Sequence, residues 1–234
     1  MGHAICIMSG IRHNPGFGAE LREVEGILSM FIRTLNARAI MSDQVPGMED
    51  PEHFPYCIWY PDVASEATYR ALAAQYPQLR YYVGRACAVA GYVDLYRELD
   101  LLPDLSIADE ARDNRHLPGA QVIFELIVSQ PVWWRVMDDY NRSVSLDSPS
   151  SSRFRLNGDT AVRSTLDLKR RFNPDLTHPG YNDGQNGNNP SPLDTAVPAY
   201  FNITEDWSTD KYSSVTYCSS HHPWIFLFGP TKKT

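Results

Sequence analysis

The chain of 234 residues carries a formal net charge of −7, with an apolar fraction of 43% and a charged fraction of 21%. These fractions are ordinary for a globular protein, and the length suits one sizeable core. The acidic balance argues against a protein that binds nucleic acid or an anionic membrane, because either partner needs a basic face. We therefore expect no nucleic acid and no membrane among its partners.

The charge is divided unevenly along the chain. Residues 1–142 contain 12 arginines, no lysine and 19 acidic residues, whereas residues 143–234 hold all four lysines and are neutral overall. The later part is rich in Ser, Gly, Asn and Pro, a composition that buries too little apolar surface to offset the entropy of ordering. We predict a loose lead-in over 1–18, a helical domain over 19–142 and a low-complexity, largely disordered tail over 143–234 with a short helix near 160–172.

No targeting or membrane-spanning segment is evident. The first residues lack a basic region, and no apolar run reaches the roughly 18 residues that a membrane span needs. The four widely spaced cysteines are expected to be free thiols, and Cys57 and Cys87 lie among apolar residues and are predicted to be core residues. We expect an intracellular protein, cytoplasmic or nuclear.

The first two predicted helices follow from apolar spacing and end signals. Apolar residues recur at intervals of three and four from Leu21 to Leu35, which predicts a helix that begins at Ala19. The next helix begins after Ser65, whose hydroxyl can cap the first turn, and ends before Pro77. Both helices belong to the predicted helical domain.

Further helices are predicted up to residue 142. The stretch 79–99 is divided into two helices at Gly91, because glycine accepts a positive φ at a helix end. Pro118 suits the first turn of another helix. The apolar and aromatic residues over 132–140 are interpreted as a final helix.

The segment that starts a short helix at Ser106 is mostly charged, and we expect it to face solvent. The carboxylate pairs Asp109–Glu110 and Asp138–Asp139 could support acid–base catalysis only if buried together, and we interpret both as solvated. No histidine spacing indicates a metal site, and no nucleophile or phosphate-loop motif occurs. The sequence therefore predicts no catalytic residue, no metal and no cofactor.

Residues 86–99 resemble the middle of an ankyrin repeat. Cys87 and the alanine after it stand for the small pair of the inner helix, Tyr92 replaces the histidine of the turn, and Leu95 and Leu99 occupy outer-helix positions. The T-P-L-H opening of the repeat is absent. The resemblance implies a helix-turn-helix unit that needs neighbouring helices to cover its faces.

A second resemblance is carried by four stretches, Arg85-Ala-Cys-Ala-Val-Ala-Gly-Tyr92, Leu101-Leu-Pro-Asp-Leu-Ser-Ile-Ala108, Val136-Met-Asp-Asp-Tyr140 and Asn157-Gly-Asp-Thr-Ala-Val-Arg-Ser-Thr-Leu-Asp-Leu-Lys-Arg170. With them, residues 60 to about 171 resemble a family of functionally uncharacterised fungal proteins. The resemblance implies further ankyrin-like helices in longer members, and it brings no known activity. Near Asp206 the chain departs into a different ending, either native or the product of a truncated gene model.

Candidate contact residues come from the helical surface. Adjacent helical positions diverge by about 100°, so one of Trp133 and Trp134 can pack inward while the other anchors a partner. Our predicted contact residues are Tyr92, Trp133, Trp134, Arg85, Arg97 and Arg135.

The sequence as a whole predicts an all-α fold, an irregular helical array that is partly ankyrin-like, with a disordered C-terminal segment. We expect a non-catalytic protein–protein interaction module whose acidic, arginine-bearing exterior suits a basic or polar protein partner. Two alternatives stay open, an enzyme of unrecognised class and a fragment of a longer solenoid without autonomous function. A cluster of buried polar residues in a pocket would favour the enzyme.

Overall fold

The computed structural model describes residues 2–138, 143–147 and 149–152, and this part of the chain is predominantly helical, which confirms the expected all-α class. Its elements in chain order are α1 (Gly2–His13), the 3-10 helix η1 (Ala19–Glu23), α2 (Ser29–Met41), η2 (Pro51–His53), α3 (Glu66–Gln75), η3 (Pro77–Leu79), α4 (Arg80–Ala90), α5 (Val93–Glu98), α6 (Leu105–Asp113), α7 (Pro118–Val128) and the strands β1 (Trp133–Arg135), β2 (Met137–Asp138), β3 (Ser143–Val144) and β4 (Ser150–Ser152).

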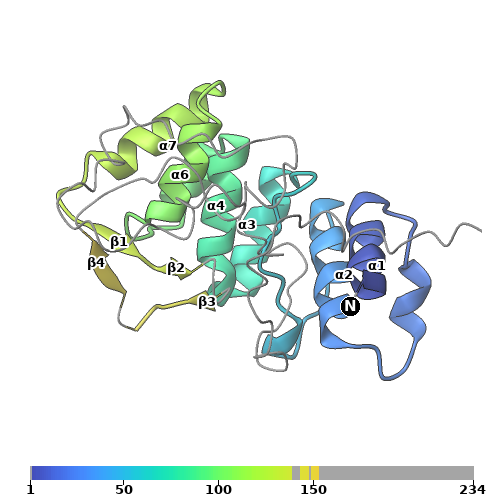
Figure 1. Ribbon diagram of the computed structural model, residues 1–234. Coiled ribbons are helices and arrows are strands. Elements are labelled where there is room, and N and C mark those ends of the chain that lie inside the picture. The colour runs from blue at the N-terminus through green and yellow to red at the C-terminus, as the bar shows by residue number, and fades with distance from the viewer. Residues whose placement is uncertain (1, 139–142, 148, 153–234) are drawn as a thin grey trace, which may run out of the picture.

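The elements are arranged along one long axis of the molecule. Figure 1 shows α1 and α2 at one end, α6, α7 and the four short strands at the other, and α3 and α4 between them. Helix α4 occupies the centre of this array, because it packs against α3, α5, α6 and α7. The site described below lies at the end of the array that carries the strands.

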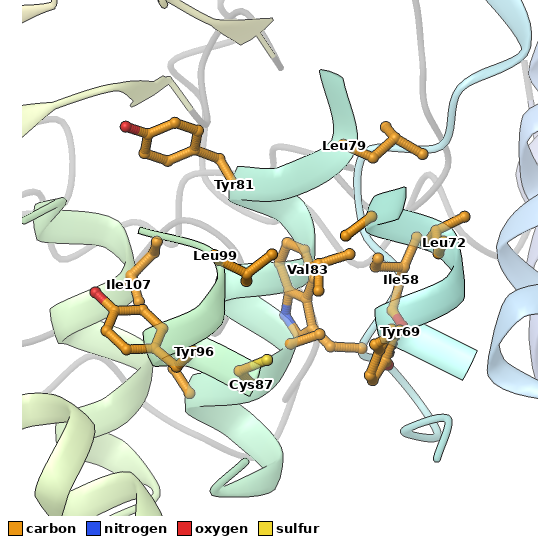
Figure 2. Packing of buried hydrophobic residues seen from close by; sticks show 14 of the residues in the cluster. Ile58, Tyr69, Leu72, Leu79, Tyr81, Val83, Cys87, Tyr96, Leu99 and Ile107 are labelled. Atoms are coloured by element: carbon orange, nitrogen blue, oxygen red, sulfur yellow. Dashed lines mark hydrogen bonds between the residues drawn. The ribbon is translucent and has the colours of Figure 1, made fainter. Parts of the chain in front are cut away.

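The main core is formed where the helices around α4 meet the loop that precedes α3. Both Cys57 and Cys87 are fully buried in it, as expected. Figure 2 shows how side chains from successive elements converge there, including Ile58 from the loop, Tyr69 and Leu72 from α3, Val83 and Cys87 from α4, Tyr96 from α5 and Ile107 from α6.

Local sequence signals correctly located several helix ends. The hydroxyl of Ser65 accepts a hydrogen bond from the backbone N–H of Thr68 at the start of α3. Pro118 occupies the first turn of α7. Gly91 ends α4 with φ of 77°, the left-handed conformation that glycine adopts without steric cost. Each of these signals acts on the backbone within a few residues, which is why the sequence alone revealed them.

The turn at Gly91 also makes a close contact with α7. A Cβ atom placed on Gly119 would overlap the backbone carbonyl of Gly91. The start of α7 therefore lies against the α4–α5 turn with backbone touching backbone. This contact brings α7 onto the α4–α5 pair, and it requires glycine at position 119.

The N-terminal part of the chain differs from the prediction. Residues 1–18, expected to be loose, include α1, whose Met8 and Ile11 are fully buried. The single helix expected from residue 19 is instead divided into η1 and α2, because Gly26 adopts φ of 71° between them. The spacing of apolar residues through this break was therefore misleading.

The helix predicted over 132–140 is wrong within its described part, 132–138, which contains strands β1 and β2. Strand β1 pairs antiparallel with β4, and β2 pairs antiparallel with β3. The expected domain boundary at 142 also falls inside this paired region, since β3 and β4 follow it. The rest of the expected disordered tail, with its helix near 160–172, lies outside the described residues.

Helix α6 begins earlier and is more buried than predicted. Its N-cap is Asp104 rather than Ser106, and the carboxylate accepts from the backbone N–H of Ile107. Asp109 and Glu110 are buried rather than solvated. The helix packs between α4 and α7, and its buried charges are paired. Arg112 pairs with Asp109 within the helix, and Glu110 pairs with Arg85 on α4. None of the helices described here is long and apolar enough to cross a bilayer.

Candidate functional site

The buried carboxylate of Asp104 joins the start of α6 to the strands. Its Oδ1 accepts from the backbone N–H of Ile107 at 3.1 Å, and its Oδ2 accepts from the N–H groups of Val136 and Met137 at 2.8 and 3.1 Å. The residue is fully buried. Three amide donors therefore surround one carboxylate and compensate for part of its lost hydration.

The pKa of Asp104 is raised above its usual value because burial removes water from the charged form. The three backbone amides oppose this effect, and so does the positive charge of Arg85. The three amides are donors, so they bind the charged carboxylate in preference to its protonated form. The three hydrogen bonds thus favour the charged carboxylate of Asp104, whereas its burial favours the protonated form.

Arg85 lies beside this site and connects three elements. Its Nη2 lies 3.2 Å from Oε1 of Glu110 on α6, and its guanidinium carbon lies 4.9 Å from the ring centroid of Trp59. The Arg85 side chain is 0% exposed and that of Glu110 is 4% exposed. This ion pair and the cation–π contact join α4 to α6 and to the loop before α3.

The arrangement of these buried charges is suited to holding elements together rather than to chemistry. Asp104 is surrounded by backbone donors and Arg85 is enclosed between Trp59 and Glu110. Both side chains are completely buried. The sign expected of an enzyme was a cluster of buried polar residues lining a pocket, whereas these two side chains are enclosed in the core.

The surface next to Asp104 is formed by two chain segments. The N–H of Trp134 donates to the carbonyl of Pro103 at 2.8 Å, and Asp104 and Trp134 form a parallel bridge. Leu102 and Val132 each lie two residues before one member of this bridge, and they are 40% and 44% exposed. We name Leu102, Val132, Trp133, Trp134 and Arg135 the β1 surface.

The two tryptophans are both half-buried and packed against the core. The indole N–H of Trp133 donates to the carbonyl of Ile127 at the end of α7, at 3.0 Å. Because β1 is a strand, the side chains of Trp133 and Trp134 point to opposite faces, and not about 100° apart as expected for a helix. Arg135, at the end of β1, is exposed.

The other three predicted contact residues lie on or between α4 and α5. Arg85 is fully buried and cannot reach a partner from its position in the core, which corrects its assignment to the surface. The hydroxyl of Tyr92 donates to the carbonyl of Ala64 at 3.1 Å, so this ring links the α4–α5 turn to the segment before α3. Arg97 is exposed on α5, with Nη1 lying 3.6 Å from Oδ1 of Asp94.

Sequence reasoning missed the residues that organise this region, namely Leu102, Asp104, Glu110 and Val132. A signal for Asp104 was available, because an aspartate directly after a proline and before apolar residues is a common helix start. Leu102 and Val132 carried no such signal, since their two segments meet through a pairing between residues that are 30 apart in the sequence.

Comparison with known proteins gives one match. The family model of the YKP1 C-terminal domain matches residues 59–166, which is just under half of the chain. No curated protein and no solved structure matches the chain. The family match agrees with the expected resemblance to an uncharacterised fungal family, and nothing found supports ankyrin repeats. Trp59, Arg85, Asp104 and Glu110 all lie within the matched range.

Proposed function

We propose that the chain is a non-catalytic protein–protein interaction module and that the β1 surface is its contact site. The observation that carries this proposal is the exposure of two apolar residues, Leu102 and Val132, one on each of two segments that backbone contacts hold together. Exposed apolar side chains on a rigid platform, next to partly buried tryptophans, are typical of binding hot spots.

The charges around this surface indicate the chemistry of the partner. Residues 1–142 are net acidic, and Arg135 is an exposed cation at the edge of the surface. A partner segment with apolar side chains, a basic or polar surround and one carboxylate for Arg135 fits this pattern. We assign the module to the cytoplasm or nucleus, in line with its sequence.

The ankyrin-like description is part of the same proposal. The helix pair α4–α5 turns at a left-handed Gly91, and the pair α6–α7 follows it and packs on it. Successive antiparallel helix pairs of this kind are the units that stack in solenoids. Tyr92 and Arg97, on the α4–α5 unit, are secondary contact residues in this proposal.

The second candidate, a fragment of a longer solenoid, is supported by α7. Apart from Pro118, Gln121 and Glu125, its other eight residues are apolar or glycine, yet Ala120, Ile123 and Ile127 are its only buried residues. Val122 and Leu126, four residues apart on one flank of the helix, are half-buried. A further helix packed against this flank would complete their burial.

The test uses the full chain with a tag, purified from an extract of its own cells. The variant Leu102→Ser/Val132→Ser removes the apolar pair at exposed positions, so the fold should be retained by circular dichroism. The matched control is Val24→Ser/Leu28→Ser, because both of those side chains are more than half exposed and lie near α2. We expect one protein to co-purify near stoichiometrically with the wild type and the control, and to be lost from the Leu102/Val132 variant.

Three results would overturn the proposal. One is the absence of any co-purifying protein when the chain is well folded. Another is equal loss of the partner from both double variants, because a general loss of apolar surface would then explain the binding. The third is retention of the partner by the Leu102/Val132 variant, which would place the contact elsewhere on the chain.

A further inference from the structure

We propose that Asp104 is the positioning residue of the β1 surface, because its carboxylate holds the strand segment against the start of α6. A role of Asp104 in binding rests on the proposed function of the β1 surface. Its role in holding the strand segment does not, and hydrogen exchange tests that role without a partner.

The two oxygens of the carboxylate have different tasks. Oδ1 accepts from Ile107 and caps α6, a local contact three residues away. Oδ2 accepts from the consecutive amides of Val136 and Met137, which are 32 and 33 residues away. One side chain therefore determines both where α6 starts and where the chain passes from β1 to β2.

Other contacts also attach the strand segment. The N–H of Trp134 donates to the carbonyl of Pro103, the indole of Trp133 donates to the carbonyl of Ile127, and Val136 and Met137 are buried in the core. The strands themselves are two or three residues long, and β1 pairs with β4 while β2 pairs with β3. Short two-stranded ribbons have little stability of their own, so a buried anchor is needed to hold them in one place.

A carboxylate suits this position better than the amide of asparagine. Three N–H donors converge on the side chain, and a carboxylate presents acceptors on both of its ends. An asparagine would present one acceptor and one donor, so its NH₂ group would face at least one N–H group. The positive charge of Arg85 nearby further favours a negatively charged residue here.

Asp104→Ser separates the capping of α6 from the attachment of the strand segment. Serine is a good N-cap and can still accept from Ile107, but its shorter side chain with one oxygen cannot also reach Val136 and Met137. We expect the amides over 132–138 to exchange hydrogen at least ten times faster than in the wild type, while exchange over 105–113 changes less than twofold. The measurement is hydrogen exchange by mass spectrometry on the full chain.

The matched control is Asp50→Ser. Asp50 is also an aspartate at an N-cap, with its carboxylate accepting from Glu52 two residues on, but it is exposed and has no described bond to the strands. Exchange over 132–138 should be unchanged in this variant. Asp104→Asn is the second test variant, in which we expect the same selective loss of protection over 132–138.

The proposal is overturned if exchange over 132–138 stays unchanged in Asp104→Ser, or if protection over 105–113 is lost equally. It is also overturned if neither Asp104 variant folds, since a positioning residue would leave the helical array intact. The co-purification described above is repeated with Asp104→Ser. Loss of the co-purifying protein from this variant supports both proposals. Faster exchange with retained binding supports the positioning role and contradicts the assignment of the β1 surface as the contact site.

Discussion

Arg85 on α4 and Glu110 on α6 form an ion pair in which the two charged atoms lie 3.2 Å apart and both side chains are almost completely buried. The pair crosses the most central packing contact of the array. Such a pair is costly to break and inexpensive to replace, because a lone charge left in the core has no water to compensate for it.

We therefore expect Arg85→Met to lower the free energy of unfolding by about 3–5 kcal/mol, since it leaves Glu110 without its cation. The double variant Arg85→Met/Glu110→Met should recover most of this loss. Urea unfolding followed by circular dichroism measures both. Arg97→Met is the control, because its exposed pair with Asp94 should contribute less than about 1 kcal/mol. Equal or greater instability of the double variant would contradict the expectation.

The close approach of Gly119 to Gly91 gives a second prediction. Gly119→Ala places a methyl group against the backbone carbonyl of Gly91, which cannot move aside as a flexible side chain can. We expect a loss of about 1–3 kcal/mol in the free energy of unfolding, measured in urea. Gly47→Ala is the control, because an added Cβ there has no neighbour within 4 Å. A stability equal to that of the wild type would show that α7 does not approach the turn so closely.

The buried phenol of Tyr96 gives a prediction about alkaline pH. Burial raises the pKa of Tyr96 above its ordinary value. Between pH values of about 10 and the folded-state pKa, the unfolded chain therefore loses this proton while the folded chain retains it, so the free energy of unfolding falls as pH rises.

Tyr96→Phe removes this proton from the balance. The slope of unfolding free energy against pH above about 10 should become shallower by up to roughly 1.4 kcal/mol per pH unit. Urea titrations at several pH values between 8 and 11 measure the slope. An unchanged slope would mean that the phenol of Tyr96 reaches water in the folded state.

Arg12 provides a prediction for the N-terminal end of the molecule. Its Nη1 donates to the carbonyls of Cys57 at 3.0 Å and Tyr60 at 2.6 Å, and Nη1 of Arg38 donates to the carbonyl of Arg12 at 2.9 Å. Arg12→Met should speed hydrogen exchange in α1 at least tenfold and leave α4 and α6 protected. The same protection in α1 as in the wild type would show that apolar contacts of Met8 and Ile11 are sufficient to hold it.

The sequence predicted those features that depend on neighbours in the chain. The cap at Ser65, the proline at the start of α7 and the left-handed turn at Gly91 are all local, and all were predicted correctly. The helical class followed from the sum of such signals, with apolar residues at helical spacing between them.

The features that were missed depend on distant partners. Val132 to Val136 was assigned to a helix, yet Pro103 and Asp104 bind its backbone from about 30 residues away and hold it extended. Helix α6 was placed in solvent because its charges were counted without Arg85, which lies 25 residues earlier and pairs with Glu110. Tertiary contacts of this kind override local preference, and a single sequence carries no direct record of them.

The two bonds donated by Arg12 end on backbone carbonyls, and not on the side chains of Cys57 and Tyr60. Every residue type offers the same carbonyl. The N-terminal helices can therefore stay attached while the side chains of that loop change in evolution, as long as the loop keeps its path. Divergence of the loop sequence between related chains would leave this attachment intact, whereas a one-residue deletion between 57 and 60 would break it.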